Sequence, residues 1–122
     1  ELAGLAVDRV SETSPSQVSS VDIDRVHAAR AMLIAALQDP PSLAALARAV
    51  GLNPRKLTRC YRAVFGASVY ADLQELRLQQ AFRLLADGEI SVSQAAYRVG
   101  YSPAHFSVVF RKRCGVSPGR MS

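Results

Sequence analysis

The sequence predicts an all-α fold of about seven helices, in which one pair of short helices occurs twice. Three observations support this prediction. Apolar residues recur every three or four positions, glycine and proline interrupt that period at regular places, and one stretch returns 49 residues further along. The chain has 122 residues, of which 49% are hydrophobic, so it can bury one modest core or two small ones. We therefore expect a single globular module.

The chain is predicted to begin with a flexible linker and a first helix. Residues 9–20 are rich in serine and have no regular period, so residues 1–21 are interpreted as the linker. A linker this close to the start leads us to expect that a further part of a larger protein precedes it. The first helix is predicted over about residues 22–38, because Val26 and Leu33 share one stripe and two prolines follow it.

A first pair of short helices is predicted within residues 42–66. Ser42 is a candidate N-cap, and Gly51 ends the first helix of the pair. Asn53 is a second N-cap candidate, with Pro54 at the position inside a helix that best tolerates proline. Two short helices joined by a tight turn that contains glycine form a helix-turn-helix.

The same pattern returns within residues 91–115. The offset is constant and needs no insertion, so the chain is predicted to contain one structural unit twice. The glycines at the two turns are expected to adopt a left-handed backbone. The clearest pairs are Ser42 with Ser91, Val50 with Val99, Gly51 with Gly100, Pro54 with Pro103, and Gly66 with Gly115.

A long linker helix is predicted over residues 68–87, between the two copies. Leu73 and Leu76 lie on one face of this helix and Leu78 and Leu85 on the other, so both faces are expected to be buried. Its apolar part would span roughly 27 Å at 1.5 Å per residue. That length is close to the roughly 34 Å of one turn of B-DNA, so the units could reach successive major grooves.

Positive charge is concentrated in one part of the chain. Residues 1–41 hold three arginines and six acidic residues, whereas residues 42–122 hold twelve basic and four acidic residues. Such a local surplus is typical of proteins that bind a polyanion, most often nucleic acid. No apolar stretch approaches the ~20 residues that span a bilayer, and no secretory leader opens the chain. We expect a cytoplasmic protein without a membrane partner.

The second helix of the first copy carries the residues expected to read DNA bases. Leu57, Tyr61 and Val64 form its inward stripe, so its basic residues lie outward. Arg55 and Arg59 are one turn apart and suit guanine, and Thr58 suits a thymine methyl group or a base edge. Lys56 and Arg62 suit phosphates; an ordinary solvated basic face is the alternative. The expected DNA-binding set is Asn53, Arg55, Lys56, Thr58, Arg59 and Arg62.

The matching helix of the second copy is less polar, so the two units are expected to contribute unequally. Its basic run suits phosphate anchoring, and its small and apolar residues suit weaker base reading. His105 suits a base, a phosphate or solvent equally well. The expected DNA-binding set is Ser102, Ala104, His105, Ser107, Val108, Arg111 and Lys112.

Catalysis, metals and cofactors have no support in the sequence. Cys60 and Cys114 lack metal-site spacing and are interpreted as small buried hydrophobes. His27 has no second ligand nearby and is interpreted as structural. We expect neither an enzyme nor a cofactor. A helical protein-interaction module, whose basic face binds an acidic partner, remains the alternative to DNA binding.

The paired pattern resembles the DNA-binding domain of AraC/XylS-type bacterial regulators over residues 22–119. The residues that carry the resemblance are 43–52, 65–68, 90–101, Phe106, Phe110 and 115–118. The resemblance implies base contacts by Arg55, Thr58 and Arg59, and by Ala104, His105, Ser107 and Val108. Members often have arginine at the position of Val108, which implies weaker reading by the second unit. It further implies promoter DNA and RNA polymerase as partners, a monomeric fragment, and a preceding sensor domain through which the full-length protein can dimerise. A role as activator is expected, with repression left open as the alternative.

Overall fold

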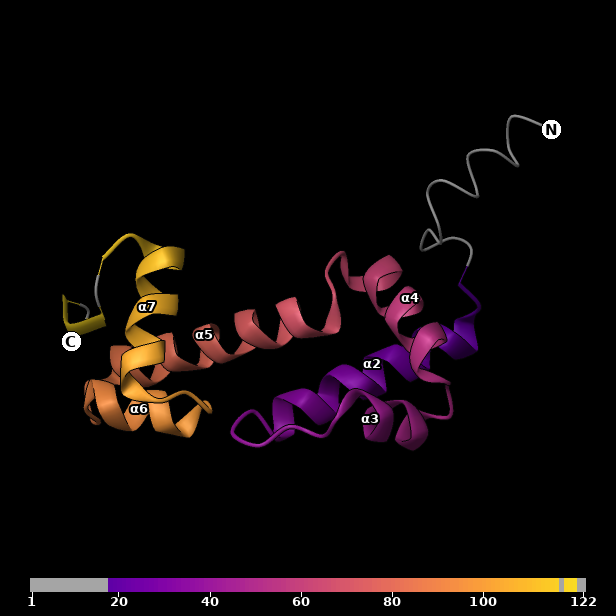
Figure 1. Cartoon of the computed structure of the whole chain (residues 1–122), viewed down its shortest axis with the longest axis horizontal. Coiled ribbons are helices and arrows are strands. Elements are labelled where there is room, and N and C mark those ends of the chain that lie inside the picture. The colour runs from indigo at the N-terminus through magenta and orange to yellow at the C-terminus, as the bar shows by residue number, and fades with distance from the viewer. Residues whose placement is uncertain (1–17, 117, 121–122) are drawn as a thin grey trace, which may run out of the picture. The chain divides into compact units, whose positions relative to one another are not determined.

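The computed structural model describes residues 18–116 and 118–120, and all regular structure in them is helical. This confirms the all-α prediction, with six α-helices in the described part where about seven helices were expected. No helix in these ranges is long and apolar enough to cross a membrane. The elements are α2 (Ser20–Ala35), α3 (Leu43–Val50), α4 (Pro54–Phe65), α5 (Val69–Asp87), α6 (Val92–Arg98), α7 (Pro103–Cys114) and the short 3₁₀ helix η2 (Pro118–Arg120) (Figure 1).

The chain divides into two compact units. Among the described residues, unit 1 is formed by residues 18–33 with 41–72, and unit 2 by residues 34–40 with 73–116 and 118–120. Unit 1 contains α3 and α4 together with most of α2, and unit 2 contains α6 and α7 together with most of α5. Each unit therefore holds one of the two predicted helix-turn-helix pairs.

The predicted caps and turn of the first pair are confirmed. The Ser42 hydroxyl accepts the backbone N–H of Ala45 at 3.1 Å, which caps α3. Gly51 ends that helix with φ +80°, a left-handed value that residues other than glycine rarely adopt. Asn53 caps α4, and Pro54 is its first residue. The local sequence is thus sufficient to place this turn.

The second pair repeats the arrangement in unit 2. Ser91 and Gln94 form a reciprocal capping box at the start of α6, in which each side chain accepts the other residue's backbone N–H. Gly100 lies at the turn with φ +96°, and Ser102 caps α7. The duplication predicted from the constant offset is therefore present in the backbone as well as in the residues.

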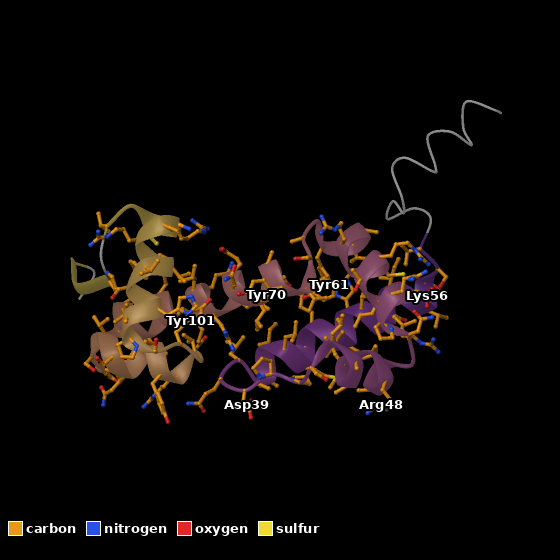
Figure 2. All side chains as sticks on the ribbon, viewed as in Figure 1. Asp39, Arg48, Lys56, Tyr61, Tyr70 and Tyr101 are labelled. Carbon is orange, nitrogen blue, oxygen red and sulfur yellow. The ribbon has the colours of Figure 1, made fainter. Side chains whose placement is uncertain are left out.

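Each unit has its own hydrophobic core. In unit 1, Tyr61 lies among the helices and is fully buried together with Val26, Leu46 and Leu57 (Figure 2). In unit 2, Phe106 and Phe110 pack with Val99 and Leu85. Burying such side chains contributes about 1.5–3 kcal/mol each to stability, so these residues hold α4 and α7 against the other helices of their units.

The first helix differs from its predicted range of 22–38. It begins two residues earlier because the Ser19 hydroxyl accepts the backbone N–H of Asp22 at 3.1 Å. It ends at Ala35, and the residues that follow make hydrogen bonds within unit 2 instead of continuing the helix. The Leu37 carbonyl accepts the Arg77 guanidinium at 3.0 Å, and the Gln38 amide donates to the carbonyl of Tyr97 at 3.0 Å.

The linker helix is found at Val69–Asp87, within one residue of its predicted range. Leu73, Leu76, Leu78 and Leu85 are buried as expected, whereas Val69, Phe82 and Leu84 are half-buried. Residues 1–17 of the predicted flexible linker lie outside the described residues.

Candidate nucleic-acid interface

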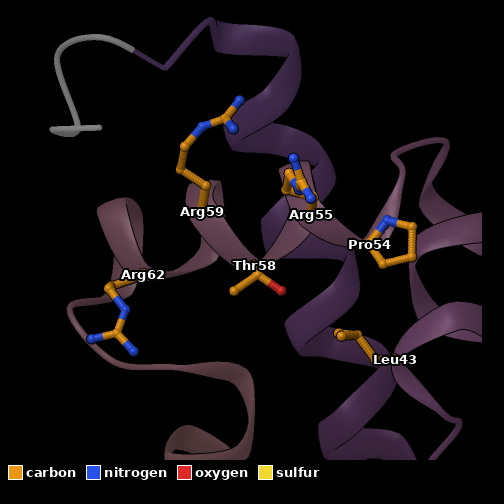
Figure 3. A pocket seen from close by; sticks show the side chains of 6 residues that line it. All are labelled: Leu43, Pro54, Arg55, Thr58, Arg59 and Arg62. Carbon is orange, nitrogen blue, oxygen red and sulfur yellow. The ribbon is translucent and has the colours of Figure 1, made fainter. Parts of the chain in front are cut away.

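The exposed face of α4 collects the residues predicted to read bases. Leu57, Cys60 and Tyr61 are buried on its inner face, which leaves the other face open to solvent. An open hollow of about 460 Å³ lies on that outer face (Figure 3). The residues that line it are Leu43, Pro54, Arg55, Thr58, Arg59 and Arg62. Four of the six predicted side chains of this unit therefore share one surface.

The other two predicted residues of unit 1 have additional partners within the protein. The Asn53 side-chain oxygen accepts the backbone N–H of Lys56 at 2.8 Å, so it is occupied by the helix cap. The Lys56 ammonium lies 3.2 Å from the carboxylate of Asp22, which is itself largely buried. Because this pair offsets the charge of Lys56, the lysine is less available to a phosphate than the arginines of the hollow.

Helix α7 presents a less polar face ahead of its basic run. Phe106 and Phe110 are fully buried, and the imidazole of His105 stacks edge-on against Tyr101 at a centroid distance of 5.0 Å. The Ser102 hydroxyl accepts the backbone N–H of His105 at 3.2 Å. All seven predicted residues of this unit are exposed: Ser102, Ala104, His105, Ser107, Val108, Arg111 and Lys112.

One arginine of the basic run in α7 has a partner that the sequence did not reveal. The Arg113 guanidinium donates through Nε and Nη2 to the two carboxylate oxygens of Glu75, each at 3.0 Å. The hydrogen bond from Arg113 lowers the pKa of Glu75 below its usual value. Arg113 therefore ties α7 to α5, while Arg111 and Lys112 are exposed on the surface of α7.

A buried polar cluster supports α4 from behind. The Tyr61 hydroxyl donates to the carboxylate of Asp72, and the Arg30 guanidinium donates to the same oxygen at 2.9 Å. Burial, followed by the hydrogen bond to Asp72, raises the pKa of Tyr61 well above its usual value. The tyrosine thus keeps its proton and remains a donor. This cluster joins α2, α4 and α5, and local sequence patterns did not predict it.

Sequence comparison places the chain among transcriptional regulators. Residues 46–122 match the protein family described as "Helix-turn-helix domain". The regulatory protein PchR of Pseudomonas aeruginosa is 54% identical over 96 residues, which cover 75% of this chain and 32% of PchR. The regulator GlxA of Rhizobium meliloti is 37% identical over 87 residues, which cover 70% of this chain and 27% of GlxA. The chain spans about a third of the length of these relatives.

Solved structures share the fold. An AraC-type transcriptional regulator from Chromobacterium violaceum matches with a TM-score of 0.76 and 26% identity, over 84% of this chain and 93% of that chain. The DNA-binding domain of the global transcriptional factor AdpA was solved in complex with a target DNA. It matches with a TM-score of 0.72 and 26% identity, over 88% of this chain and 89% of that chain.

Two capped helix pairs, each with an exposed second helix, define a helix-turn-helix DNA-binding domain rather than an enzyme. The chain belongs to the AraC/XylS family of transcriptional regulators and corresponds to their DNA-binding domain.

Proposed function

We propose that this chain binds promoter DNA with sequence specificity, as the DNA-binding part of a bacterial transcriptional regulator. The observation that carries the proposal is the hollow on α4, where three exposed arginines surround Thr58. Arginine pairs with guanine in the major groove and with phosphates at its edge, so one surface supplies both base reading and backbone attraction. The similarity to AdpA, whose domain was solved with a target DNA, supports the same conclusion.

The two recognition helices have unequal roles in this proposal. Helix α4 reads bases through Arg55, Thr58 and Arg59, whereas α7 mainly holds phosphates through Arg111 and Lys112. The exposed face of α7 ahead of its basic run carries Ala104, His105, Ser107 and Val108, of which only His105 and Ser107 have side chains that can hydrogen-bond to base edges. Sequence preference is therefore concentrated in unit 1.

Further parts of the proposal concern the assembly that acts on DNA. The helices α4 and α7 enter successive major grooves of one asymmetric site, and the 122-residue chain does so as a monomer. In the full-length protein a sensor domain responds to an effector and brings two chains together. The regulator acts in the cytoplasm, where it recruits RNA polymerase as an activator. A relative named as an activator, RhaS of Escherichia coli, supports this last step.

Salt dependence and competition test the proposal against a protein-interaction module. A binder with about four phosphate contacts should lose about a hundredfold or more in affinity for duplex DNA between ~50 and ~200 mM salt. At fixed salt, a fragment of its own promoter should compete far better than a random duplex of the same length. Equal competition by the two duplexes, measured by fluorescence anisotropy, would show that the chain does not read sequence.

Two neighbouring arginines are predicted to have different effects. Arg59→Ala should weaken binding to the preferred duplex by about 1–3 kcal/mol and relax the preference at one base pair. Arg62→Ala should weaken binding to preferred and random duplexes alike, because its partner is a phosphate. The measurement is the dissociation constant of each variant for a panel of single-base-pair variants. Arg83→Ala is the control, since Arg83 is exposed on α5 and does not line this hollow. Identical uniform losses for Arg59 and Arg62 would contradict the base-reading role.

A further inference from the structure

Leu43 is a large apolar side chain exposed on the basic face of unit 1. It is the first residue of α3, directly after the N-cap Ser42. Its exposed fraction is 41%, whereas Leu46, the other leucine of the same helix, is completely buried. Packing of the core of unit 1 therefore uses Leu46 and leaves much of the Leu43 side chain in contact with solvent.

The surroundings of Leu43 combine an apolar floor with a charged rim. Leu43, Pro54 and Thr58 line the hollow on α4 together (Figure 3). The charged side chains that also line the hollow are Arg55, Arg59 and Arg62. An apolar protein partner would have to remove these charges from water at high cost. The major groove of DNA offers a matching surface, with phosphates at its edges and thymine methyl groups on its floor.

We propose that Leu43 is a specificity-determining residue that contacts the 5-methyl group of a thymine beside the base pairs read by Arg55 and Arg59. This inference rests on the proposed function, because it assumes that the face of α4 enters the major groove. It adds a residue from outside the recognition helix, and it adds a base identity that hydrogen bonds from arginine do not supply.

Unit 2 has no equivalent contact, so the thymine preference belongs to unit 1. The residue that corresponds to Leu43 is Val92, which is shorter and half-buried. The positions of Arg55, Thr58 and Arg59 are taken by Ala104, Ser107 and Val108. The hollow beside α6 is lined by other residues, namely Ser93, Gln94, Tyr97, Arg98 and Pro103. The combination of apolar floor and arginine rim is therefore absent from the described part of unit 2.

Replacing thymine with deoxyuridine tests the contact directly, because only the methyl group is lost. A preferred duplex is first selected from a random pool with the 122-residue chain. Each thymine is then replaced in turn, and affinity is measured for the wild type and for Leu43→Ala. One replacement should weaken the wild type about fourfold, the value expected for one buried methyl group. The same replacement should leave Leu43→Ala unchanged.

Two further variants separate base contact from general packing. Leu43→Met keeps an apolar side chain of similar volume and should retain most of the response to deoxyuridine. Ile34→Ala removes an apolar side chain that is 49% exposed outside the hollow, and it should respond as the wild type does. Circular dichroism should show that both alanine variants remain folded.

The outcomes distinguish this inference from the function on which it rests. If Leu43→Ala responds to every deoxyuridine as the wild type does, or if no thymine matters to the wild type, the inference is wrong even though DNA binding stands. If Arg59→Ala and Arg62→Ala bind every duplex as tightly as the wild type, the proposed function itself is wrong. A loss by Leu43→Ala that is equal for all duplexes would assign the residue to the sugar-phosphate backbone and overturn its role in specificity.

Discussion

Replacing Gly100 with alanine is expected to lower the free energy of unfolding by about 3–4 kcal/mol, because strain and a steric clash add together. Gly100 has φ +96°, and an added Cβ would lie 2.8 Å from the carbonyl oxygen of Leu37. It would also lie 2.7 Å from the Arg77 guanidinium, which cannot retreat freely because its Nε donates to that same carbonyl. Urea denaturation followed by circular dichroism measures the change.

Gly115 provides the matched control for this substitution. It lies in the same unit with φ +83°, and an added Cβ would meet nothing within 4 Å. Gly115→Ala should therefore cost about 1–2 kcal/mol from backbone strain alone. The difference between the two variants measures the clash with Leu37 and Arg77. Equal midpoints for both variants would show that the residues around Gly100 move aside at no cost.

The helix-turn-helix pairs were predictable because their signals are local. A serine or asparagine cap acts on a backbone N–H within three residues, and a left-handed glycine acts on the turn that contains it. Asn53 and Gly51 therefore predict the turn before any tertiary contact is known. The constant offset between the copies then extends the prediction to unit 2, where Ser102 and Gly100 take the same places.

The end of α2 was not predictable because distant residues determine it. The apolar period continues through Leu37, so local sequence favours a longer helix. Arg77 and Tyr97 instead offer hydrogen-bond partners to the segment that follows Ala35. Such partners are 40 and 59 residues away in the sequence, and a window of one or two helical turns cannot detect them.

The candidate site shows the same division between local and distant effects. Helical periodicity correctly placed Arg55, Arg59 and Arg62 on one exposed face, because residues three or four apart share a side of a helix. Periodicity could not show that Lys56 pairs with Asp22 or that Leu43 of the preceding helix shares the hollow. Both depend on how helices pack. Charge counting from sequence therefore overstates the number of cations available to DNA.

The polar cluster of Tyr61, Asp72 and Arg30 distinguishes unit 1 from unit 2, although the two units repeat the same sequence pattern. Tyr61 of unit 1 corresponds to Phe110 of unit 2, and both are fully buried. The tyrosine needs a partner for its hydroxyl, which Asp72 supplies. Arg30 offsets the carboxylate charge and also lies over the ring of Phe65 at 5.1 Å. Helix α4 is thus held by directional bonds that α7 lacks at the equivalent position.

Removing the centre of this cluster is expected to have the second large effect. Asp72→Ala should lower the free energy of unfolding by about 3 kcal/mol, because it leaves the buried hydroxyl of Tyr61 without its acceptor and Arg30 without its counterion. Arg30 is 34% exposed and can regain water, which keeps the loss below that of a fully buried pair. Tyr61→Phe should cost only about 1 kcal/mol, since Asp72 keeps Arg30.

A double-mutant cycle between Tyr61→Phe and Asp72→Ala tests whether the two side chains act together. The combined loss should be smaller than the sum of the single losses by about 1 kcal/mol, because the first substitution already removes the shared hydrogen bond. Asp87→Ala, at an exposed site on the same helix, should change stability by less than about 0.5 kcal/mol. Additive losses in the cycle would show that the Tyr61 hydroxyl gains nothing from Asp72. If the two side chains act together, each single variant should also show a weaker form of the base preference that we propose for α4, measured at denaturant concentrations well below those that unfold it. The salt dependence of DNA binding should stay the same, because the cations themselves remain.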